Sequence, residues 1–335
     1  GKGIAGAETI FEKALAPRFG ERSNIQDAWG SGRSIAAQDG TVREGTNGED
    51  VVLAMDLTIQ TFAEEALDKA CETWSPRAAV VVVLDPSTGD LLAAVSRPGF
   101  DPACRGSLTR KATRFGVVSD AYEVGSTMKP LIAAAALDAG VVHPRDVFDC
   151  TTSGSYPIHG RRLHDHKALG RQNFAGVIIH SSNIGMAQIS ERMEIDAFFR
   201  HVGALGFGAP TKCGIPGEAK GVVRRATVKD YTTKEKRDLH DRKWSLPSIA
   251  MGHDITATPL QFASAFAALV NGGVLFRPRV AISVAGRELP PRPLRQVFDP
   301  KTSRQHMVPI LVRVVEEATG RNARVPGYRV GGKTG

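Results

Sequence analysis

The stretch that decides the fold is Tyr122-Glu123-Val124-Gly125-Ser126-Thr127-Met128-Lys129-Pro130. Proline is tolerated only near the first turn of a helix, so the Ala- and Leu-rich helix over 130–139 must begin close to Ser126. Residues three apart at a helix start share one face, which brings Ser126 and Lys129 together and turns Met128 toward apolar packing. The Ser126 N–H then lies among the unpaired donors of a helix N-terminus, where it can stabilise an oxyanion.

A serine hydroxyl is a weak nucleophile and needs a base within hydrogen-bond reach. Lys129 can act as that base only when burial or a positive neighbour favours its neutral form, because a free lysine has a pKa near 10.4. The second motif, Ser181-Ser182-Asn183, interrupts an otherwise helical stretch over 174–193. Asn183 can hold a peptide amide and the lysine together, since its side chain both donates and accepts, and Ser181 can relay a proton to a leaving amine.

The third motif is Lys333-Thr334-Gly335, and we expect it on a strand that starts at Tyr328. Lys333 is the candidate positive neighbour of the lysine base. Lys333 and Thr334 would offer a cation and a hydroxyl to a substrate carboxylate. Gly335 would let the substrate backbone approach as an additional strand.

Each motif alone has an ordinary interpretation. Ser126 and Lys129 could be a surface pair, Asn183 a helix cap and Lys333 a solvated charge. The first two patterns each arise about once by chance in such a chain, whereas Lys-Thr-Gly arises only ~0.1 times. The order of the three motifs and their surroundings favour a functional site.

The rest of the chain indicates an α+β fold rather than a doubly wound sheet. An amphipathic helix over 58–71 precedes a buried strand over 79–84, a turn over Asp85–Asp90 and a returning strand over 91–96. We also expect a strand over 51–55, helices over 196–202 and 258–270, and a further helix within 298–319. Residues 143–172 and 203–221 are expected to be loop-rich.

The length of 335 residues suggests about two domains. Residues 1–49 are rich in Gly, Ser and charge, with a helical stretch over 8–15 and turns near Trp29–Gly32 and Asp39-Gly40. We expect them to be the remnant of a preceding module, and 50–335 to be the main domain. Hydrophobic residues at 42% and charged residues at 23% exclude disordered and fibrous classes.

The net charge is +8, but the basic residues are scattered and aromatics make up only 6%, so no nucleic-acid partner is expected. A solvated basic surface, including a loop over 234–237, accounts for the charge, and an affinity for an anionic membrane or substrate stays open. The longest apolar run, 78–84, is too short to span a membrane, and we expect no signal peptide within these 335 residues.

Cysteines and histidines give weaker signals. The four cysteines form no Cys-x-x-Cys pair, so a zinc ribbon is excluded, and their disulfide state stays open between three pairings and buried thiols: Cys71, Cys104, Cys150 and Cys213. His164-Asp165-His166 could chelate a metal, but a polar loop with surface histidines is favoured.

The surroundings of the motifs closely resemble class B penicillin-binding proteins over residues 50–335, and most of all the division-type (septal) members. The stretches that carry the resemblance are 84–93, 122–130, 181–186, 205–208, 214–218 and 258–261. The resemblance implies a penicillin-binding transpeptidase fold related to serine β-lactamases, with an antiparallel sheet covered by helices on both faces and an all-helical subdomain. It also implies that further strands and a C-terminal helix follow Gly335.

The resemblance implies a peptidoglycan D,D-transpeptidase that crosslinks stem peptides ending in D-Ala-D-Ala through a Ser126 acyl-enzyme, and that β-lactams acylate. Lys129, Ser181 and Asn183 would be catalytic, and Lys333, Thr334 and Gly335 would bind substrate. It further implies a single-pass anchor in the bacterial inner membrane, a periplasmic catalytic domain, and partners that include a membrane glycosyltransferase and other division proteins. It implies no metal or organic cofactor.

The chain departs from the family pattern at three places. Val124 stands where proline is usual, Gly252-His253-Asp254 replaces a more Gly-rich spelling, and the chain ends at Gly335, where the next N–H would complete the oxyanion hole. Two alternatives are kept. A D,D-carboxypeptidase or β-lactamase would transfer the acyl group to water. A catalytically silent penicillin-binding scaffold would transfer it to no acceptor.

Overall fold

The structure, a computed structural model, describes residues 6–22, 24–25, 35–36, 42–101, 104, 109, 112–224 and 244–335. The expected turns near Trp29–Gly32 and Asp39-Gly40 and the loop over 234–237 lie outside these residues. The chain divides into two compact units. The first unit takes in Gly1–Ala54, Gly214–Pro216 and Val280–Pro290, and the second takes in the remainder.

The first unit consists of short helices and antiparallel strand pairs. Its helices are α1 (Gly6–Ile10) and α2 (Glu12–Leu15), so the single helix expected over 8–15 is interrupted at Phe11, where ψ is 17°. Four short strands form two antiparallel pairs, β1 (Glu21–Arg22) with β4 (Val42–Arg43) and β2 (Asn24–Ile25) with β3 (Ile35–Ala36). A three-stranded sheet has the order β17 (Arg287–Glu288), β16 (Ala281–Val284) and β5 (Val51–Leu53).

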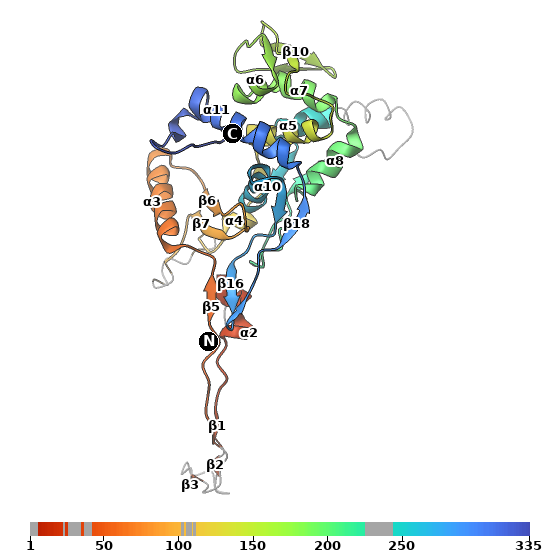
Figure 1. The fold of residues 1–335 in the computed structure, drawn as a ribbon. Coiled ribbons are helices and arrows are strands. Elements are labelled where there is room, and N and C mark those ends of the chain that lie inside the picture. The colour runs from red at the N-terminus through yellow and green to blue at the C-terminus, as the bar shows by residue number, and fades with distance from the viewer. Residues whose placement is uncertain are drawn as a thin grey trace, which may run out of the picture. The chain divides into compact units, whose positions relative to one another are not determined.

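The second unit contains the predicted hairpin of β6 (Ala79–Leu84) and β7 (Leu91–Arg97), which pair antiparallel with Val81 opposite Val95. Helix α3 (Leu57–Trp74), orange in Figure 1, packs on one face of the hairpin, where Ala63 and Leu67 meet Ala93 and Val95. Alternate residues of a strand face opposite sides, and on the other side Val80 lies against Gly116 of α4 (Gly116–Ser119). Helices therefore cover both faces, as predicted.

The strand over 79–84 is only partly buried, however, which corrects the expectation of a fully buried strand. Its residues all retain intermediate exposure, whereas alternate residues of β7 are buried. The physical reason is the pairing. Among the described residues β6 pairs with β7 alone, so its other edge has no strand beside it.

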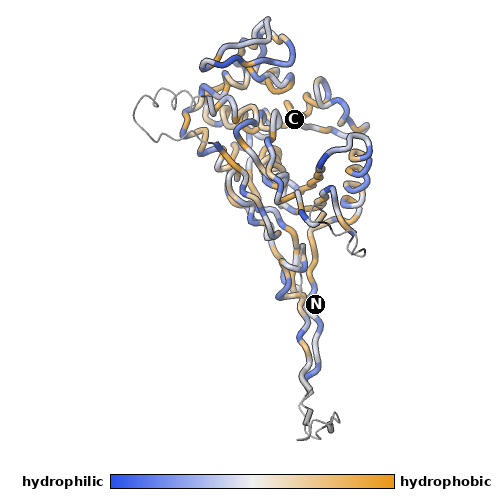
Figure 2. The backbone as a smooth tube through the Cα atoms, turned by 180° about the vertical axis from the view of Figure 1, so that it is seen from behind, coloured by the Kyte–Doolittle hydropathy of each residue, from blue (hydrophilic) through white to orange (hydrophobic). Residues whose placement is uncertain are grey.

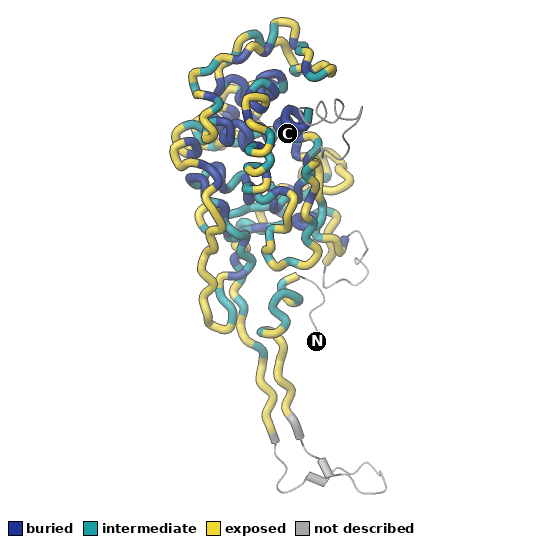
Figure 3. The backbone as a smooth tube through the Cα atoms, turned by 90° about the vertical axis from the view of Figure 1, so that its right-hand side faces the viewer, coloured by how far each residue is buried: buried dark blue, intermediate teal, exposed yellow. Residues whose placement is uncertain are grey.

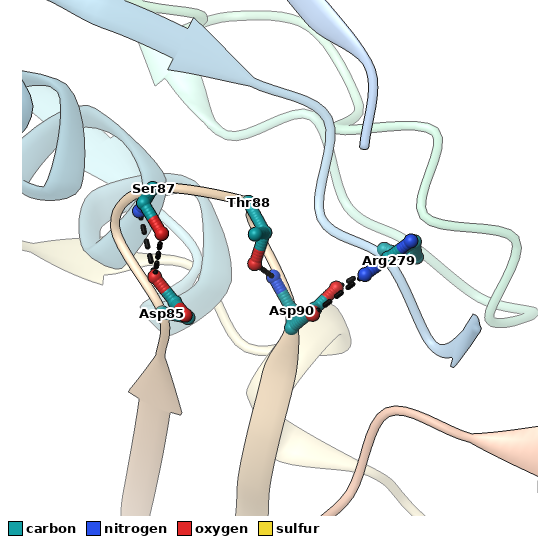
Figure 4. Close-up of polar contacts among 5 residues, drawn as sticks. All are labelled: Asp85, Ser87, Thr88, Asp90 and Arg279. Carbon is teal, nitrogen blue, oxygen red and sulfur yellow. Dashed lines mark hydrogen bonds and ion pairs between the residues drawn. The ribbon is translucent and has the colours of Figure 1, made fainter. Parts of the chain in front are cut away.

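The turn between the two strands is held by side chains (Figure 4). The Asp85 carboxylate accepts hydrogen bonds from the Ser87 backbone N–H at 2.7 Å and the Ser87 hydroxyl at 2.6 Å. Gly89 adopts φ = +80°, which favours glycine. Asp90 forms a bidentate ion pair with Arg279, with Nη2 to Oδ2 at 2.7 Å, and this pair connects the hairpin to the segment that follows α10 (Pro259–Asn271).

The main core is helical, and Figure 3 shows buried residues gathered there in dark blue. At its centre lies α5 (Lys129–Asp138), whose residues 129–136 are all buried, because an Ala-rich helix that is apolar all round can pack between other elements. Around it lie α6 (Phe174–Ile179), α7 (Asn183–Glu191), α8 (Ile195–Ala204), a helix over 244–250, α10 (Pro259–Asn271) and α11 (Val308–Glu317). A π-helical turn over Thr302–Met307 leads into α11, and a 3-10 turn over Arg321–Ala323 follows it.

The predicted helix boundaries have identifiable causes. Thr258 and Gln261 form a capping box at the start of α10, and Gly272, at φ = +104°, ends it. The polar interruption at 181–183 separates α6 from α7, because the Ser182 hydroxyl accepts a hydrogen bond from the Gly185 N–H at 2.9 Å and caps α7.

The loop-rich segment 143–172 contains more strand than expected. β9 (Val147–Asp149) pairs with β12 (Arg171–Asn173), and β10 (Ser155–Ile158) pairs with β11 (Arg161–His164). The hairpin of β10 and β11, at the top of Figure 2, is mainly hydrophilic, which is why its sequence reads as loop. The remaining strands are β8 (Tyr122–Glu123), β13 (Val222–Val223) and β14 (Ile255–Ala257) in one sheet, and β15 (Val274–Phe276) with β18 (Pro293–Gln296).

The strand expected from Tyr328 to Gly335 is not formed in the described residues. This segment packs on α11 instead, since the Gly332 N–H donates to the Leu311 carbonyl at 3.1 Å and no strand pairs with it there. None of the four cysteines forms a disulfide: Cys71, Cys104, Cys150 and Cys213. No helix in the described part of the chain has the length and apolar character to cross a membrane.

Candidate active site

Ser126 lies in a single 3-10 turn, Gly125–Met128, which leads directly into α5. Its position as the second residue of that turn leaves its N–H without an intrahelical partner, as the sequence predicts. Gly125 adopts φ = +58° and donates its N–H to the Gly252 carbonyl at 3.2 Å. The glycine sets the approach to the serine, because only a residue that tolerates positive φ can turn the chain here.

Lys129 begins α5, one helical turn after Ser126, and its exposed fraction is 0%. Its Nζ donates to the Ser181 carbonyl at 2.6 Å, the Ser181 hydroxyl at 3.2 Å and Asn183 Oδ1 at 2.7 Å. Three bonds occupy the three N–H donors of an ammonium group. The first two motifs therefore meet through the lysine, and its bonding partners in the described residues do not include the Ser126 hydroxyl.

Burial of this amine lowers the pKa of Lys129 to about 7, because an ammonium loses its hydration when it leaves water. The positive charge of Lys333 lowers it further, and the negative charge of Asp165 opposes both effects. Near neutral pH a substantial fraction of Lys129 is therefore uncharged. A lysine in this state can accept a proton, which an exposed lysine does rarely.

The Ser181–Asn183 turn is shaped to receive this amine. Ser181 adopts φ = +58°, an uncommon conformation for a residue with a side chain, which lets its carbonyl and hydroxyl bond to the same amine. The Asn183 side chain accepts from Lys129 and donates its Nδ2 to the His164 carbonyl at 2.8 Å. The ordinary interpretation of Asn183 as a helix cap is wrong, since Ser182 provides the cap.

The third motif lies beside the first. A Cβ on Gly335 would lie 3.4 Å from Thr127 Cγ2 and 3.6 Å from the Val124 carbonyl oxygen. Lys333 Nζ donates to the Thr334 carbonyl at 2.8 Å, and the Thr334 hydroxyl bonds to that of Thr319 at 2.9 Å. Burial lowers the pKa of Lys333 to about 8. The motif reaches the site as an irregular segment, which corrects the expectation that it lies on a strand.

Two neighbouring features escaped the sequence interpretation. Gly252 adopts φ = +86° and packs so closely on Gly125 that an added Cβ would lie 1.9 Å from the Gly125 carbonyl oxygen. Next to it, His253 Nδ1 lies 3.3 Å from a Glu123 carboxylate oxygen, with both side chains more than half exposed. The sequence shows that Gly252-His253-Asp254 departs from the family pattern, but it does not show that these residues contact the Gly125–Met128 turn that carries Ser126.

The His164-Asp165-His166 cluster forms no metal site. No group of three or more His, Cys, Asp or Glu side chains in the described residues could hold a metal ion. The Asp165 carboxylate points to the start of α7 instead, where it accepts the N–H groups of Asn183 and Ile184. His164 ends strand β11 and His166 follows it, both exposed, whereas the sequence assigned Asp165 no role.

An α+β fold in which a serine begins a helix, and a lysine one turn later is buried against a Ser-Ser-Asn turn, defines the class of penicillin-binding serine proteins. Residues 79–335 match the family model described as the penicillin binding protein transpeptidase domain, and the chain belongs to this family. The predicted fold class and family are thereby confirmed.

Named relatives support the class B assignment. Stage V sporulation protein D of Bacillus subtilis is 32% identical over 100% of this chain and 51% of its own length. The probable peptidoglycan D,D-transpeptidase FtsI of Caulobacter vibrioides is 32% identical over 96% of this chain and 52% of its own. The chain thus spans about half the length of these relatives. Among solved structures, the transpeptidase domain of Burkholderia pseudomallei penicillin-binding protein 3 is 29% identical, with a TM-score of 0.70 over 84% of this chain and 76% of that one.

Proposed function

We propose that the protein is a peptidoglycan D,D-transpeptidase that forms an acyl-enzyme on Ser126 and is acylated by β-lactams. The single observation that carries the proposal is the state of Lys129. A fully buried amine with a pKa near 7, one helical turn after a serine at a helix start, is a base matched to neutral pH. A lysine with a purely structural role does not require a pKa near neutral pH.

In the acylation step the Ser126 hydroxyl oxygen attacks the carbonyl carbon of the penultimate D-Ala. The hydroxyl proton passes to neutral Lys129, and the carbonyl oxygen becomes an oxyanion stabilised by the Ser126 N–H. The C–N bond to the terminal D-Ala then breaks, and its nitrogen takes a proton from Lys129, relayed by Ser181, whose hydroxyl lies 3.2 Å from the amine. D-Ala leaves as the free amino acid.

In the second step the amine of a neighbouring stem peptide attacks the Ser126 ester. Lys129 takes a proton from the attacking nitrogen, and the serine oxygen leaves with a proton, which restores the enzyme and leaves a peptide crosslink. Asn183 would orient the substrate amide, Lys333 and Thr334 would bind its carboxylate, and Gly335 would leave room for its backbone. β-Lactams would acylate Ser126 by opening of their ring amide, with no leaving group released.

The names of the relatives support a role in cell-wall synthesis during division, since they include a protein named as an FtsI transpeptidase and one named for sporulation. We further propose a single-pass anchor in the bacterial inner membrane, a catalytic domain on its outer side, and partners that include a membrane glycosyltransferase and other division proteins.

The test is covalent labelling with a fluorescent penicillin. We expect one label per protein molecule, on Ser126, and no label on Ser126→Ala. Ser75→Ala, which removes an exposed hydroxyl at the end of α3 and outside the three motifs, is the matched control and should label normally. Labelling that survives Ser126→Ala would overturn the nucleophile assignment. A label released within minutes would indicate a hydrolase, and a wild-type protein that is never labelled would indicate a silent scaffold.

A further inference from the structure

The Asp165 side chain lies outside the three motifs but is connected to two of them. It follows β11, is partly buried, and its Oδ1 accepts the Asn183 N–H at 2.5 Å and the Ile184 N–H at 3.1 Å. Its Oδ2 accepts the Ser182 hydroxyl at 2.6 Å. The Asp165 N–H in turn donates to the Gly154 carbonyl at 3.1 Å, so the loop that carries it is itself anchored.

These bonds place a negative charge against the N-terminus of α7. The first N–H groups of a helix have no intrahelical partner, and the helix dipole makes this end positive, so a carboxylate there is favoured on both counts. The helix already has a neutral cap, because the Ser182 hydroxyl accepts the Gly185 N–H. Stability of the helix alone therefore does not require a second, charged cap.

The Asp165 loop also fixes the direction of the second motif. The His164 carbonyl holds the Asn183 side-chain amide, and Asp165 holds the Asn183 backbone. With one end of Asn183 so fixed, its Oδ1 is left to accept from Lys129 at 2.7 Å. The position of the lysine amine is thus determined through Asn183 by a loop that no motif includes.

Among the described residues, two charged groups act on Lys129. Lys333, on the segment beside the serine turn, disfavours the ammonium, and Asp165 is the negative group that favours it. Cys150 lies under the turn, with its Sγ 3.2 Å from the Ser182 hydroxyl, and burial raises the pKa of its thiol, so it stays neutral. Asp165 therefore acts on the lysine by charge as well as by position.

We propose that Asp165 is a positioning residue of the acyl-transfer site, whose carboxylate anchors the Ser181–Asn183 turn against the Lys129 amine. The inference rests on the proposed roles of Ser126 and Lys129. It adds a residue and a control of protonation that the three motifs do not contain.

Two variants separate the two effects. Asp165→Asn keeps the size and one acceptor oxygen but removes the charge, whereas Asp165→Glu keeps the charge on a longer side chain. Glu194→Gln is the matched control, because Glu194 caps α8 by accepting the N–H groups of Asp196 and Ala197 in the same way, on a helix that carries none of the motifs. The measurement is the second-order rate constant for acylation by a fluorescent penicillin from pH 5 to 9, with circular dichroism to establish folding.

We expect both Asp165 variants to acylate roughly 10- to 100-fold more slowly at their optimum, because the turn is displaced. The acid limb of the profile should move to lower pH in Asp165→Asn and stay in place in Asp165→Glu, since only the first loses the charge. Glu194→Gln should match the wild type in both respects.

Three outcomes overturn the inference: unchanged profiles in both variants, an acid limb that stays in place in Asp165→Asn, or an equal loss of rate in Glu194→Gln. If Asp165→Asn does not fold, Asp165→Glu alone is the test. A lower acylation rate with the acid limb in place supports the inference, and an unchanged rate contradicts it. A wild-type protein that is not acylated contradicts the proposed function itself, so the two failures are distinguishable.

Discussion

At the scale of the residue, the site is built around an amine that is removed from water. Transfer of a charged ammonium group into the protein interior is unfavourable. Lys129 therefore loses its proton more easily than a free lysine does. Its three acceptors, two on Ser181 and one on Asn183, stabilise the protonated form when it arises. The result is a group that can hold or release a proton near pH 7.

The pH dependence of acylation follows from two lysines. Lys129 must be neutral to accept the serine proton, and its pKa is about 7, so the rate should rise as pH increases through that value. Lys333 must be charged to bind a carboxylate, and its pKa is about 8, so the rate should fall above that value. We expect a maximum between pH 7 and 8 in the rate constant for acylation by a penicillin.

The variant Lys333→Arg tests the second half of this assignment. Arginine stays charged throughout the accessible range, so the fall above pH 8 should disappear while the rise near pH 7 remains. A wild-type profile that is flat from pH 6 to 9 would contradict both assignments.

Gly252 is the residue whose lack of a side chain the serine turn requires. Gly252→Ala places a Cβ 1.9 Å from the Gly125 carbonyl oxygen, so one of the two backbones must move. We expect penicillin labelling to slow by about 100-fold, because Ser126 follows Gly125 directly. The matched control is Gly217→Ala, with φ = +82° and no atom of the described residues within 4 Å of the new Cβ.

Both glycine variants incur the strain of a left-handed alanine, about 1 kcal/mol, and should lower the free energy of unfolding by at least that amount. Only Gly252→Ala should lose labelling. Equal labelling in the two variants would show that strain, rather than the contact with Gly125, controls the site.

At the scale of the element, the β6–β7 hairpin depends on an ion pair at its turn. The side chains of Asp90 and Arg279 are 15% and 17% exposed, whereas those of Asp68 and Arg97, which join α3 to β7, are 52% and 27% exposed. Removing one partner of a largely buried pair leaves the other charge poorly solvated. An exposed pair is weaker, because water replaces the lost partner.

We therefore expect Asp90→Ala to lower the free energy of unfolding by about 2–3 kcal/mol, and Asp68→Ala to lower it by less than about 1 kcal/mol. Urea denaturation of the two variants measures the difference. Equal losses, or a larger loss for Asp68→Ala, would mean that the turn pair does not hold the hairpin in place.

At the scale of the whole molecule, one partly buried histidine should control stability in acid. His201, on α8, packs against Phe298, with 5.2 Å between the centroids of the two rings. Its Nε2 has no hydrogen-bond partner among the described residues. Burial lowers the pKa of His201 to about 4. The unfolded chain, with a pKa near 6.5, therefore binds this proton at a pH where the folded protein does not.

Above pH 6.5 neither state binds the proton, and between pH 6.5 and 4 the unfolded state binds it alone, so about 3 kcal/mol of stability is lost over that interval. His201→Phe should reduce this loss, measured as melting temperature against pH. The exposed His166→Gln is the control and should keep the wild-type acid sensitivity. An unchanged slope in His201→Phe would contradict the assignment.

Much of this architecture could be predicted from local signals. The β6–β7 hairpin, the start of α5 near Ser126 and the ends of α10 follow from Pro, Gly and capping residues that act over a few positions. The strand expected at 328–335 did not form, because a strand depends on a partner that lies elsewhere in the chain. The strands β10 and β11 were missed for a different reason, since they pair with each other locally but their hydrophilic residues are typical of a loop.

The family, the fold class and the three motifs follow from the amino-acid sequence, because each is recognised from short runs of neighbouring residues. The protonation state of Lys129 follows from the folded structure. Burial, the approach of Lys333 and the placement of Asp165 set the pKa of Lys129, and all three depend on segments 36 to 204 positions away. Electrostatic energy varies with distance and solvation, neither of which can be read along a chain.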